Sequence, residues 1–167
     1  MVKQLCMAGA ASRGLCYLGA LEHLTCSGLL DDLEIIAGVS IGSLIAVCYV
    51  IGFSPIEMFE MLLWKDTNEL RDISLDYVLN QGSVLKGDKY KTWVWDLLSE
   101  KTDPLITFED IYTKFNKKLL ITATCLQDGL TIFSTEKTPT MPIYYAVMSS
   151  MALPFIFPPI VYRSEEH

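Results

Sequence analysis

Apolar residues are grouped along the chain in short blocks whose spacing changes from strand-like to helical. Residues 2–8 and 34–37 are compact apolar runs typical of buried parallel strands, and turns rich in small residues follow them. Between them, leucines over 15–27 recur at helical spacing, and Gly28 suits the carboxyl end of that helix. This alternation predicts a right-handed, parallel βαβ unit near the start of the chain.

The remaining apolar blocks predict further helices and one antiparallel hairpin. Ser54-Pro55-Ile56-Glu57 has the pattern of a capping box with proline in the first turn. We expect helices over 41–53, 54–65, 69–80, 88–101, from 107 onward and over 142–151, and strands over 118–126 and 130–134 joined by a turn at 127–129. Helices alternating with strands place the chain in the α/β class, as a single domain over residues 1–167.

Composition and charge narrow the class of protein. With 167 residues, of which 51% are apolar, the chain is long enough for a buried core, and disorder is excluded. The formal net charge of −7, without a run of lysine or arginine, disfavours nucleic-acid binding. The longest apolar helix expected is too short to cross a bilayer and no signal peptide is evident. We therefore expect a cytoplasmic protein whose contact with membranes is peripheral.

The cysteines fit a reducing compartment. They are odd in number, they lie in apolar segments, and none forms a C-x-x-C pair. We expect all of them to be reduced core residues: Cys6, Cys16, Cys26, Cys48 and Cys125.

The strongest chemical signal is Gly38-Val39-Ser40-Ile41-Gly42, a G-x-S-x-G sequence between an expected strand and an expected helix. In that context the pattern is typical of a nucleophile elbow. A serine hydroxyl is a weak nucleophile and has to stand on an exposed turn within reach of a base. Glycines on both sides avoid a collision where strand and helix meet. The alternative is an ordinary tight turn.

A second small-residue segment follows the first expected strand and reads Gly9-Ala10-Ala11-Ser12-Arg13-Gly14. If the first two strands are neighbours, this loop lies beside Ser40, where its backbone amides can hold an oxyanion. The alternative is a βα turn built of small residues for packing. A phosphate-binding loop is disfavoured, because no Gly-Lys-Ser/Thr ending is present.

These segments together resemble the patatin-like phospholipase family. Its loop of Gly-Gly-Gly/Ala-x-Arg/Lys-Gly corresponds to residues 9–14, and its G-x-S-x-G to residues 38–42. The tail over 146–159 is similar to the family's Ala-Ser-x-Ala-x-Pro-x-x-Phe-x-Pro stretch, and the hairpin over 122–134 is similar to its central hairpin. The resemblance thus covers the chain nearly from end to end.

The resemblance implies a three-layer α/β sandwich with a mainly parallel central sheet that hydrolyses acyl esters of lipids or phospholipids. Ser40 would be the nucleophile of a Ser-Asp dyad that uses neither histidine nor metal nor cofactor. The oxyanion hole would form from the backbone of Gly9, Ala10, Ala11, Arg13 and Gly14. The Arg13 side chain either positions a lipid phosphate, braces the loop or faces solvent. Six aromatic residues either line an acyl groove or pack in the core: Trp93, Trp95, Tyr144, Tyr145, Phe155 and Phe157.

The chain departs from the family pattern in two places. Ala10 stands where glycine is usual, and a left-handed backbone there would cost alanine about 1–2 kcal/mol. The family's catalytic aspartate lies in an Asp-Gly-Gly/Ala motif after the proline-rich tail, and no such motif occurs before the chain ends. Asp128-Gly129 precedes that tail and fits the hairpin turn. The sequence thus has a nucleophile without an assigned base.

The histidines also argue against an ordinary Ser-His-Asp triad. Only His23 and His167 are present. His23 precedes Ser40, whereas an α/β-hydrolase needs its histidine late in the chain, after the acid. His167 is the C-terminal residue, which we expect to be frayed. We expect neither imidazole to reach Ser40. We also expect weak or absent lipid-ester hydrolysis by these 167 residues alone. The alternative function is a catalytically impaired protein that binds lipid or a partner, and an ordinary α/β-hydrolase esterase is a third reading.

Overall fold

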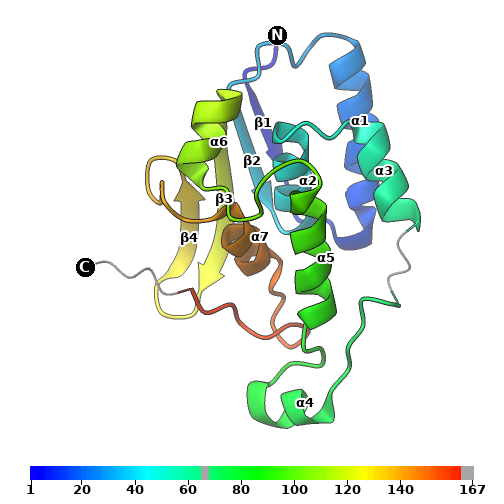
Figure 1. Ribbon diagram of the computed structural model, residues 1–167, viewed down its shortest axis with the longest axis vertical. Coiled ribbons are helices and arrows are strands. Elements are labelled where there is room, and N and C mark those ends of the chain that lie inside the picture. Colours follow the sequence, from blue (N-terminus) through cyan, green and yellow to red (C-terminus); the bar gives the residue numbers. More distant parts are fainter. Residues whose placement is uncertain (65–67, 163–167) are drawn as a thin grey trace.

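The computed structural model describes residues 1–64 and 68–162. In chain order the elements are β1 (Gln4–Met7), the 3₁₀ turn η1 (Ala11–Gly14), α1 (Leu15–Cys26), β2 (Ile35–Val39), α2 (Ile41–Val50), α3 (Pro55–Trp64), α4 (Leu75–Gln81), α5 (Asp88–Ser99), α6 (Phe108–Phe115), β3 (Lys118–Cys125), β4 (Gly129–Ser134) and α7 (Ile143–Met151). Strands and helices alternate up to α2, and the helices α2 to α6 then follow one another before β3 (Figure 1).

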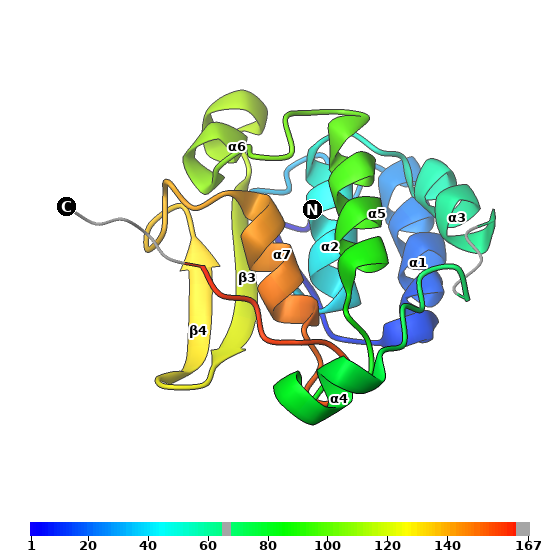
Figure 2. The same cartoon turned by 60° about the horizontal axis from the view of Figure 1, so that its bottom comes forward.

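The four strands form one sheet in the order β1-β2-β3-β4. The first three run parallel, with Cys6 opposite Ala37 and Ala37 opposite Leu120, and β4 returns antiparallel to β3 through the hairpin. The predicted βαβ start and the predicted β3–β4 hairpin are thus confirmed. The fold is α/β, with a mainly parallel sheet flanked by helices (Figures 1 and 2). The parallel order sets the carboxyl ends of β1, β2 and β3 side by side.

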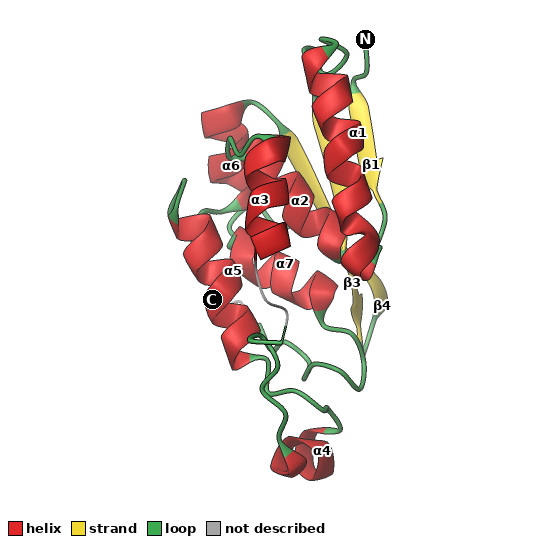
Figure 3. Cartoon of the chain, turned by 90° about the vertical axis from the view of Figure 1, so that its right-hand side faces the viewer, coloured by secondary structure: helices red, strands yellow, loops and turns green. Residues whose placement is uncertain are grey.

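Helix α2 is the centre of the core. It packs on β2 and also contacts β1, β3, α3 and α7, and eight of its ten residues are buried. Figure 3 shows the strands on one side, α2 and α7 next to them, and α5 farther out. Successive side chains of a strand point to opposite faces of the sheet. On the face toward these helices, Met7, Ile36 and Ile121 are buried, whereas Val39 lies on the other face and is exposed.

Local signals in the sequence explain the ends of several helices. Gly28 takes a left-handed conformation two residues after the last residue of α1, at the carboxyl end of the helix as predicted. At α3, the Ser54 amide donates to the Glu57 carboxylate (2.6 Å) and the Glu57 amide donates to the Ser54 hydroxyl (3.1 Å), which confirms the capping box. A second box joins Thr107 and Asp110 at α6.

One predicted helix is wrong in its bounds. The pattern predicted a helix over 69–80, but α4 begins only at Leu75. The preceding residues are held differently, because the Asp72 carboxylate accepts the backbone amides of Gly87 and Asp88 at 2.9 and 2.7 Å. Ile73 also forms an isolated antiparallel bridge with Leu85. These long-range bonds compete with the local helical signal, so the helix starts later.

The expectation that all cysteines lie in the core is also wrong. Cys48 is buried in α2 and Cys125 is half-buried, but Cys6, Cys16 and Cys26 are exposed. Cys6 falls on the sheet face away from the helices. All five are free thiols, as expected. No helix within the described ranges is long and apolar enough to cross a membrane.

Candidate active site

Ser40 occupies the turn between the end of β2 and the first residue of α2. Its backbone angles are φ 54° and ψ −128°, a region that non-glycine residues rarely adopt. Such a conformation costs roughly 1–3 kcal/mol and persists only where the surrounding packing imposes it. The sharp turn predicted between strand and helix is therefore present, and the residue at its apex is the serine.

The two glycines beside Ser40 have no room for a side chain. A Cβ placed on Gly38 would lie 2.5 Å from the Gly42 carbonyl oxygen and from the Ser43 Cα. A Cβ on Gly42 would lie 2.5 Å from the Met7 carbonyl oxygen. These distances are well inside van der Waals contact, so the G-x-S-x-G spacing is required for α2 to press against both strands.

The segment over residues 9–14 lies beside Ser40, because β1 and β2 are parallel neighbours and both end here. A Cβ on Gly9 would approach the Ser40 Cβ to 3.3 Å, and one on Gly14 would approach the Ile41 side chain to 2.8 Å. The segment is not an open loop throughout, since residues 11–14 form the 3₁₀ turn η1.

Backbone strain in this segment is at Ala11 rather than at Ala10. Ala11 has φ 46°, whereas Ala10 has φ −144° and so avoids the left-handed penalty considered from the sequence. The Arg13 amide donates to the Ala10 carbonyl oxygen at 2.9 Å, and the Arg13 side chain is exposed. Within the described ranges, the Ala10 and Ala11 amides have no backbone partner. These two amides are available to an incoming ligand.

Two further serines fix the turn, and the sequence analysis did not identify either. The Ser40 amide donates to the Ser150 hydroxyl oxygen at 2.7 Å, and Ser150 in turn donates to the Thr122 carbonyl oxygen at 2.6 Å. On the other side, the Ser43 hydroxyl donates to the Ser40 carbonyl oxygen at 2.6 Å. Ser150 thereby ties α7 and β3 to the Ser40 turn across more than a hundred residues of sequence.

Within residues 1–64 and 68–162, the Ser40 hydroxyl makes no hydrogen bond to an imidazole or a carboxylate. His23 lies in the last turn of α1, nine residues beyond Gly14. This places it about 14 Å from Gly14 along the helix axis. Asp128 is exposed at the β3–β4 turn, where its carboxylate faces the Cys125 thiol at 3.7 Å. His167 lies outside the described residues. No group of three or more metal-ligating side chains occurs in the described part of the chain.

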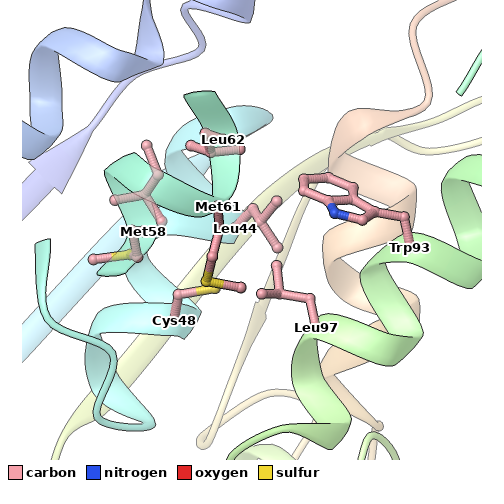
Figure 4. Close-up of a pocket in the computed structure, with 8 residues that line it drawn as sticks. Leu44, Cys48, Met58, Met61, Leu62, Trp93 and Leu97 are labelled. Carbon is pink, nitrogen blue, oxygen red and sulfur yellow. The ribbon is translucent and has the colours of Figure 1, made fainter. Parts of the chain in front are cut away.

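A small apolar cavity begins one helical turn from Ser40 and runs between α2, α3 and α5 (Figure 4). Trp93 closes one side of it, and the Cys48 thiol faces it from α2. Burial raises the pKa of Cys48 to about 12, so this thiol stays protonated and unreactive at neutral pH. The aromatic residues considered for an acyl groove lie in different places. Trp93 lines this cavity, Phe157 lines a second small hollow at the end of α7, and Phe155 is exposed.

The amino end of helix α2 contributes to the electrostatic environment of Ser40. Ser40 is the residue directly before α2, so the free amides and the positive end of the helix dipole are directed at its turn. The Ala10 and Ala11 amides, which have no backbone partner within the described ranges, belong to the neighbouring segment over residues 9–14.

Comparisons with known proteins show the family to which the chain belongs. The family described as "Patatin-like phospholipase" matches residues 5–167. A relative named "Probable lipid hydrolase 463L" from Invertebrate iridescent virus 6 is 31% identical over 97% of this chain and 57% of its own length. "Uncharacterized protein R571" of Acanthamoeba polyphaga mimivirus is 30% identical over 98% of this chain and 56% of its own length.

Solved structures show the same fold at low sequence identity. VipD from Legionella pneumophila is 15% identical with a TM-score of 0.67, covering 98% of this chain and 44% of that one. ExoU of Pseudomonas aeruginosa, in complex with SpcU, is 17% identical with a TM-score of 0.60, covering 92% of this chain and 38% of that one. The chain thus spans a little over half the length of its curated relatives. From its family match and its fold, the chain belongs to the patatin-like phospholipases.

Proposed function

We propose that this chain carries the nucleophile and the oxyanion-binding backbone of a lipid acyl hydrolase of the phospholipase A or lipase type. The observation that carries the proposal is the Ser40 turn: a serine at φ 54° between strand and helix, next to the amides of residues 9–14. Strained backbone at a serine is found where the hydroxyl has to be presented to a substrate. The iridescent virus relative, named as a probable lipid hydrolase, supports lipid as the substrate class.

In the proposed reaction the Ser40 Oγ attacks the carbonyl carbon of an acyl ester while a general base accepts the hydroxyl proton. The carbonyl oxygen becomes an oxyanion, which the amides of Ala10 and Ala11 and the positive end of α2 stabilise. The base returns the proton to the departing alcohol, which leaves an acyl group on Ser40. Water activated by the same base then releases the fatty acid and restores the hydroxyl.

The general base in this proposal is a carboxylate outside the described residues. It completes a Ser-Asp dyad of the kind that the family resemblance implies. Within the described ranges Asp128 faces Cys125, and His23 lies too far along α1. We further propose that the protein acts in the cytoplasm at the periphery of membranes, where a water-soluble domain meets its lipid substrate.

A second candidate function rests on the Ser40 hydroxyl, which bonds no imidazole or carboxylate within the described residues. Without a base the same turn can still bind an acyl carbonyl oxygen, and the chain would then be a lipid-binding or partner-binding protein with impaired catalysis. The two functions differ in whether Ser40 becomes acylated.

The test is covalent labelling of the chain extended through an Asp-Gly-Gly segment by a long-chain fluorophosphonate. Mass spectrometry should find the adduct on the peptide that contains Ser40, and Ser40→Ala should abolish it. Ser99→Ala is the matched control, because the Ser99 hydroxyl is exposed and bonds only the Trp95 carbonyl oxygen within α5. An adduct that persists in Ser40→Ala would refute Ser40 as the nucleophile. No adduct on a folded, extended chain would favour the binding function.

A further inference from the structure

The backbone of Ser40 is held differently on its two sides. Its carbonyl oxygen accepts hydrogen bonds from the Ser43 hydroxyl at 2.6 Å and from the Ser43 and Leu44 amides at 2.8 and 3.3 Å, all in the first turn of α2. Among the described residues its amide has a single partner, the Ser150 hydroxyl oxygen at 2.7 Å, across 110 residues of sequence. The carbonyl side is therefore held redundantly by neighbouring residues, whereas the amide side depends on Ser150.

The Ser150 hydroxyl stands where the pairing of β2 with β3 stops. Thr122 lies opposite the last residue of β2 in this parallel ladder. Every second residue of β3 bonds β2 in such a ladder, starting with the Lys118 amide, which donates to the Glu34 carbonyl oxygen at 2.9 Å. A continued ladder would therefore join the Ser40 amide directly to the Thr122 carbonyl oxygen. Instead the Ser150 hydroxyl lies between them, accepting from that amide and donating to that carbonyl oxygen at 2.6 Å.

The packing of α7 brings this hydroxyl to the end of the sheet. Helix α7 packs on β3 and contacts α2, and Ser150 lies in its last turn (Figure 2). The hydroxyl proton is donated to the Thr122 carbonyl oxygen, which leaves the lone pairs of the hydroxyl oxygen for the Ser40 amide. One hydroxyl thus satisfies two backbone groups of opposite polarity, whereas an alanine side chain can satisfy neither.

The conformation of Ser40 requires support of this kind. At φ 54° and ψ −128° a non-glycine residue is strained, and strained backbone persists only where the surrounding structure imposes it. Without the inserted hydroxyl, the Ser40 amide can pair directly with the Thr122 carbonyl oxygen. This pairing would lengthen β2 by a residue and draw Ser40 toward extended backbone with a negative φ. The Ser40 side chain would then no longer be held beside Gly9, where it stands in this structure.

We propose that Ser150 is a positioning residue for the proposed reaction. Its hydroxyl, inserted between the Ser40 amide and the Thr122 carbonyl oxygen, holds Ser40 in the conformation from which the Ser40 Oγ attacks. The proposal rests on the proposed function in one respect, that Ser40 is the nucleophile. It deepens that function by making the reactivity of Ser40 depend on α7 as well as on the G-x-S-x-G turn. In this role Ser150 touches no reacting atom.

The first test reads the conformation of Ser40 by NMR and needs no catalysis. In the chain extended through an Asp-Gly-Gly segment, backbone couplings should report a positive φ for Ser40 in the wild type and in Ser149→Ala. Ser149 is the matched control, because its hydroxyl bonds the Tyr145 carbonyl oxygen within α7. Ser150→Ala should shift Ser40 to a negative φ and give a direct scalar coupling across a hydrogen bond between the Ser40 amide and the Thr122 carbonyl. A positive φ in folded Ser150→Ala, or the same change in Ser149→Ala, would overturn the proposal.

The second test reads the reactivity of Ser40 toward a long-chain fluorophosphonate. Ser150→Ala should lower the maximal labelling rate by about ten- to a hundredfold, because a small displacement of a reacting group is costly. The reagent concentration for half-maximal rate should stay unchanged, since the displaced group attacks rather than binds. Ser150→Thr keeps a hydroxyl and should keep both the positive φ and the labelling rate.

Two results would overturn the proposal: an unchanged maximal rate in folded Ser150→Ala, or loss of the positive φ and of labelling in Ser150→Thr. A wild type that is not labelled at Ser40 would instead refute the proposed function. The NMR result would then still decide whether Ser150 sets the conformation of Ser40, so the two failures are distinguishable.

Discussion

Helices α2 and α4 both carry leucine and valine side chains, yet these side chains are placed in opposite environments. In α2 nearly every side chain is buried between the sheet and the surrounding helices. In α4 the leucines and the valine are exposed, and the helix projects from the body of the molecule. Hydrophobicity in α2 therefore stabilises the fold and fixes Ser40, whereas in α4 it contributes little to stability.

The largest contrast is expected from truncating one apolar side chain in each helix. Ile45→Ala in α2 removes a side chain that is 1% exposed and should lower the free energy of unfolding by about 2–5 kcal/mol. Leu79→Ala in α4 should change it by less than about 0.5 kcal/mol. Urea denaturation of the two variants measures both values. Equal losses would show that α4 is as much a part of the core as α2.

Two glycines allow the same comparison between a tightly packed and an open position. Gly38 packs against the first turn of α2, whereas Gly19 has free space around it. Gly38→Ala forces a Cβ to 2.5 Å from the Gly42 carbonyl oxygen, and the overpacking should cost about 1–3 kcal/mol or more. Gly19→Ala is the control, because a Cβ there meets nothing within 4 Å and alanine favours the helix by roughly 0.5–1 kcal/mol. Thermal unfolding should therefore shift in opposite directions for the two variants. A shift in the same direction would contradict the packing described for the Ser40 turn.

Ser150→Ala tests whether α7 fixes the turn. The variant leaves the Ser40 amide and the Thr122 carbonyl oxygen without their shared hydroxyl, which should cost about 1–3 kcal/mol. Ser149→Ala is the neighbouring control, since the Ser149 hydroxyl bonds only the Tyr145 carbonyl oxygen within α7. We expect a smaller loss for that control in the same denaturation assay. Equal effects would remove Ser150 from the support of Ser40.

The smallest predicted effect concerns how stability depends on pH, through Glu57 in the first turn of α3. Hydrogen bonds from the Ser54 backbone and hydroxyl, followed by that from Lys101, lower the pKa of Glu57 from 4.5 to about 2. A lowered folded-state pKa means that its stabilisation is complete above pH 4.5 and is lost as the pH falls toward 2. The melting temperature of Glu57→Gln should therefore fall less steeply over this window. An unchanged slope in Glu57→Gln would contradict the contribution assigned to this carboxylate.

The sequence was sufficient for features that depend on local spacing. The βαβ start, the capping box at Ser54 and the position of Ser40 before α2 all follow from residues close together in the chain. The glycines at 38 and 42 also predicted the collision that the distances now show. The capping box and the sharp turn at Ser40 are decided within a few residues, which is where pattern reasoning is strongest.

Features that depend on distant partners could not be predicted. Ser150 reaches Ser40 only because α7 packs on β3, and no local pattern distinguishes it from Ser149. The start of α4 depends on Asp72 binding amides fifteen residues later. Cys6 lies in a short apolar strand, but its exposure depends on which sheet face the helices cover. Strain at Ala11 rather than Ala10 likewise follows from how η1 turns.

The most direct test of the central claim is ester turnover by the chain at two lengths, 167 residues and extended through an Asp-Gly-Gly segment, on a short-chain p-nitrophenyl ester and on a phospholipid. The account predicts turnover that depends on Ser40 in the extended chain, and little or none in the shorter one, because a serine without a base loses most of its activation. Turnover in the extended chain that survives Ser40→Ala would contradict the assignment of the nucleophile. Comparable turnover at both lengths that Ser40→Ala abolishes would place a sufficient base within residues 1–167, and Asp128 would be the first residue to test.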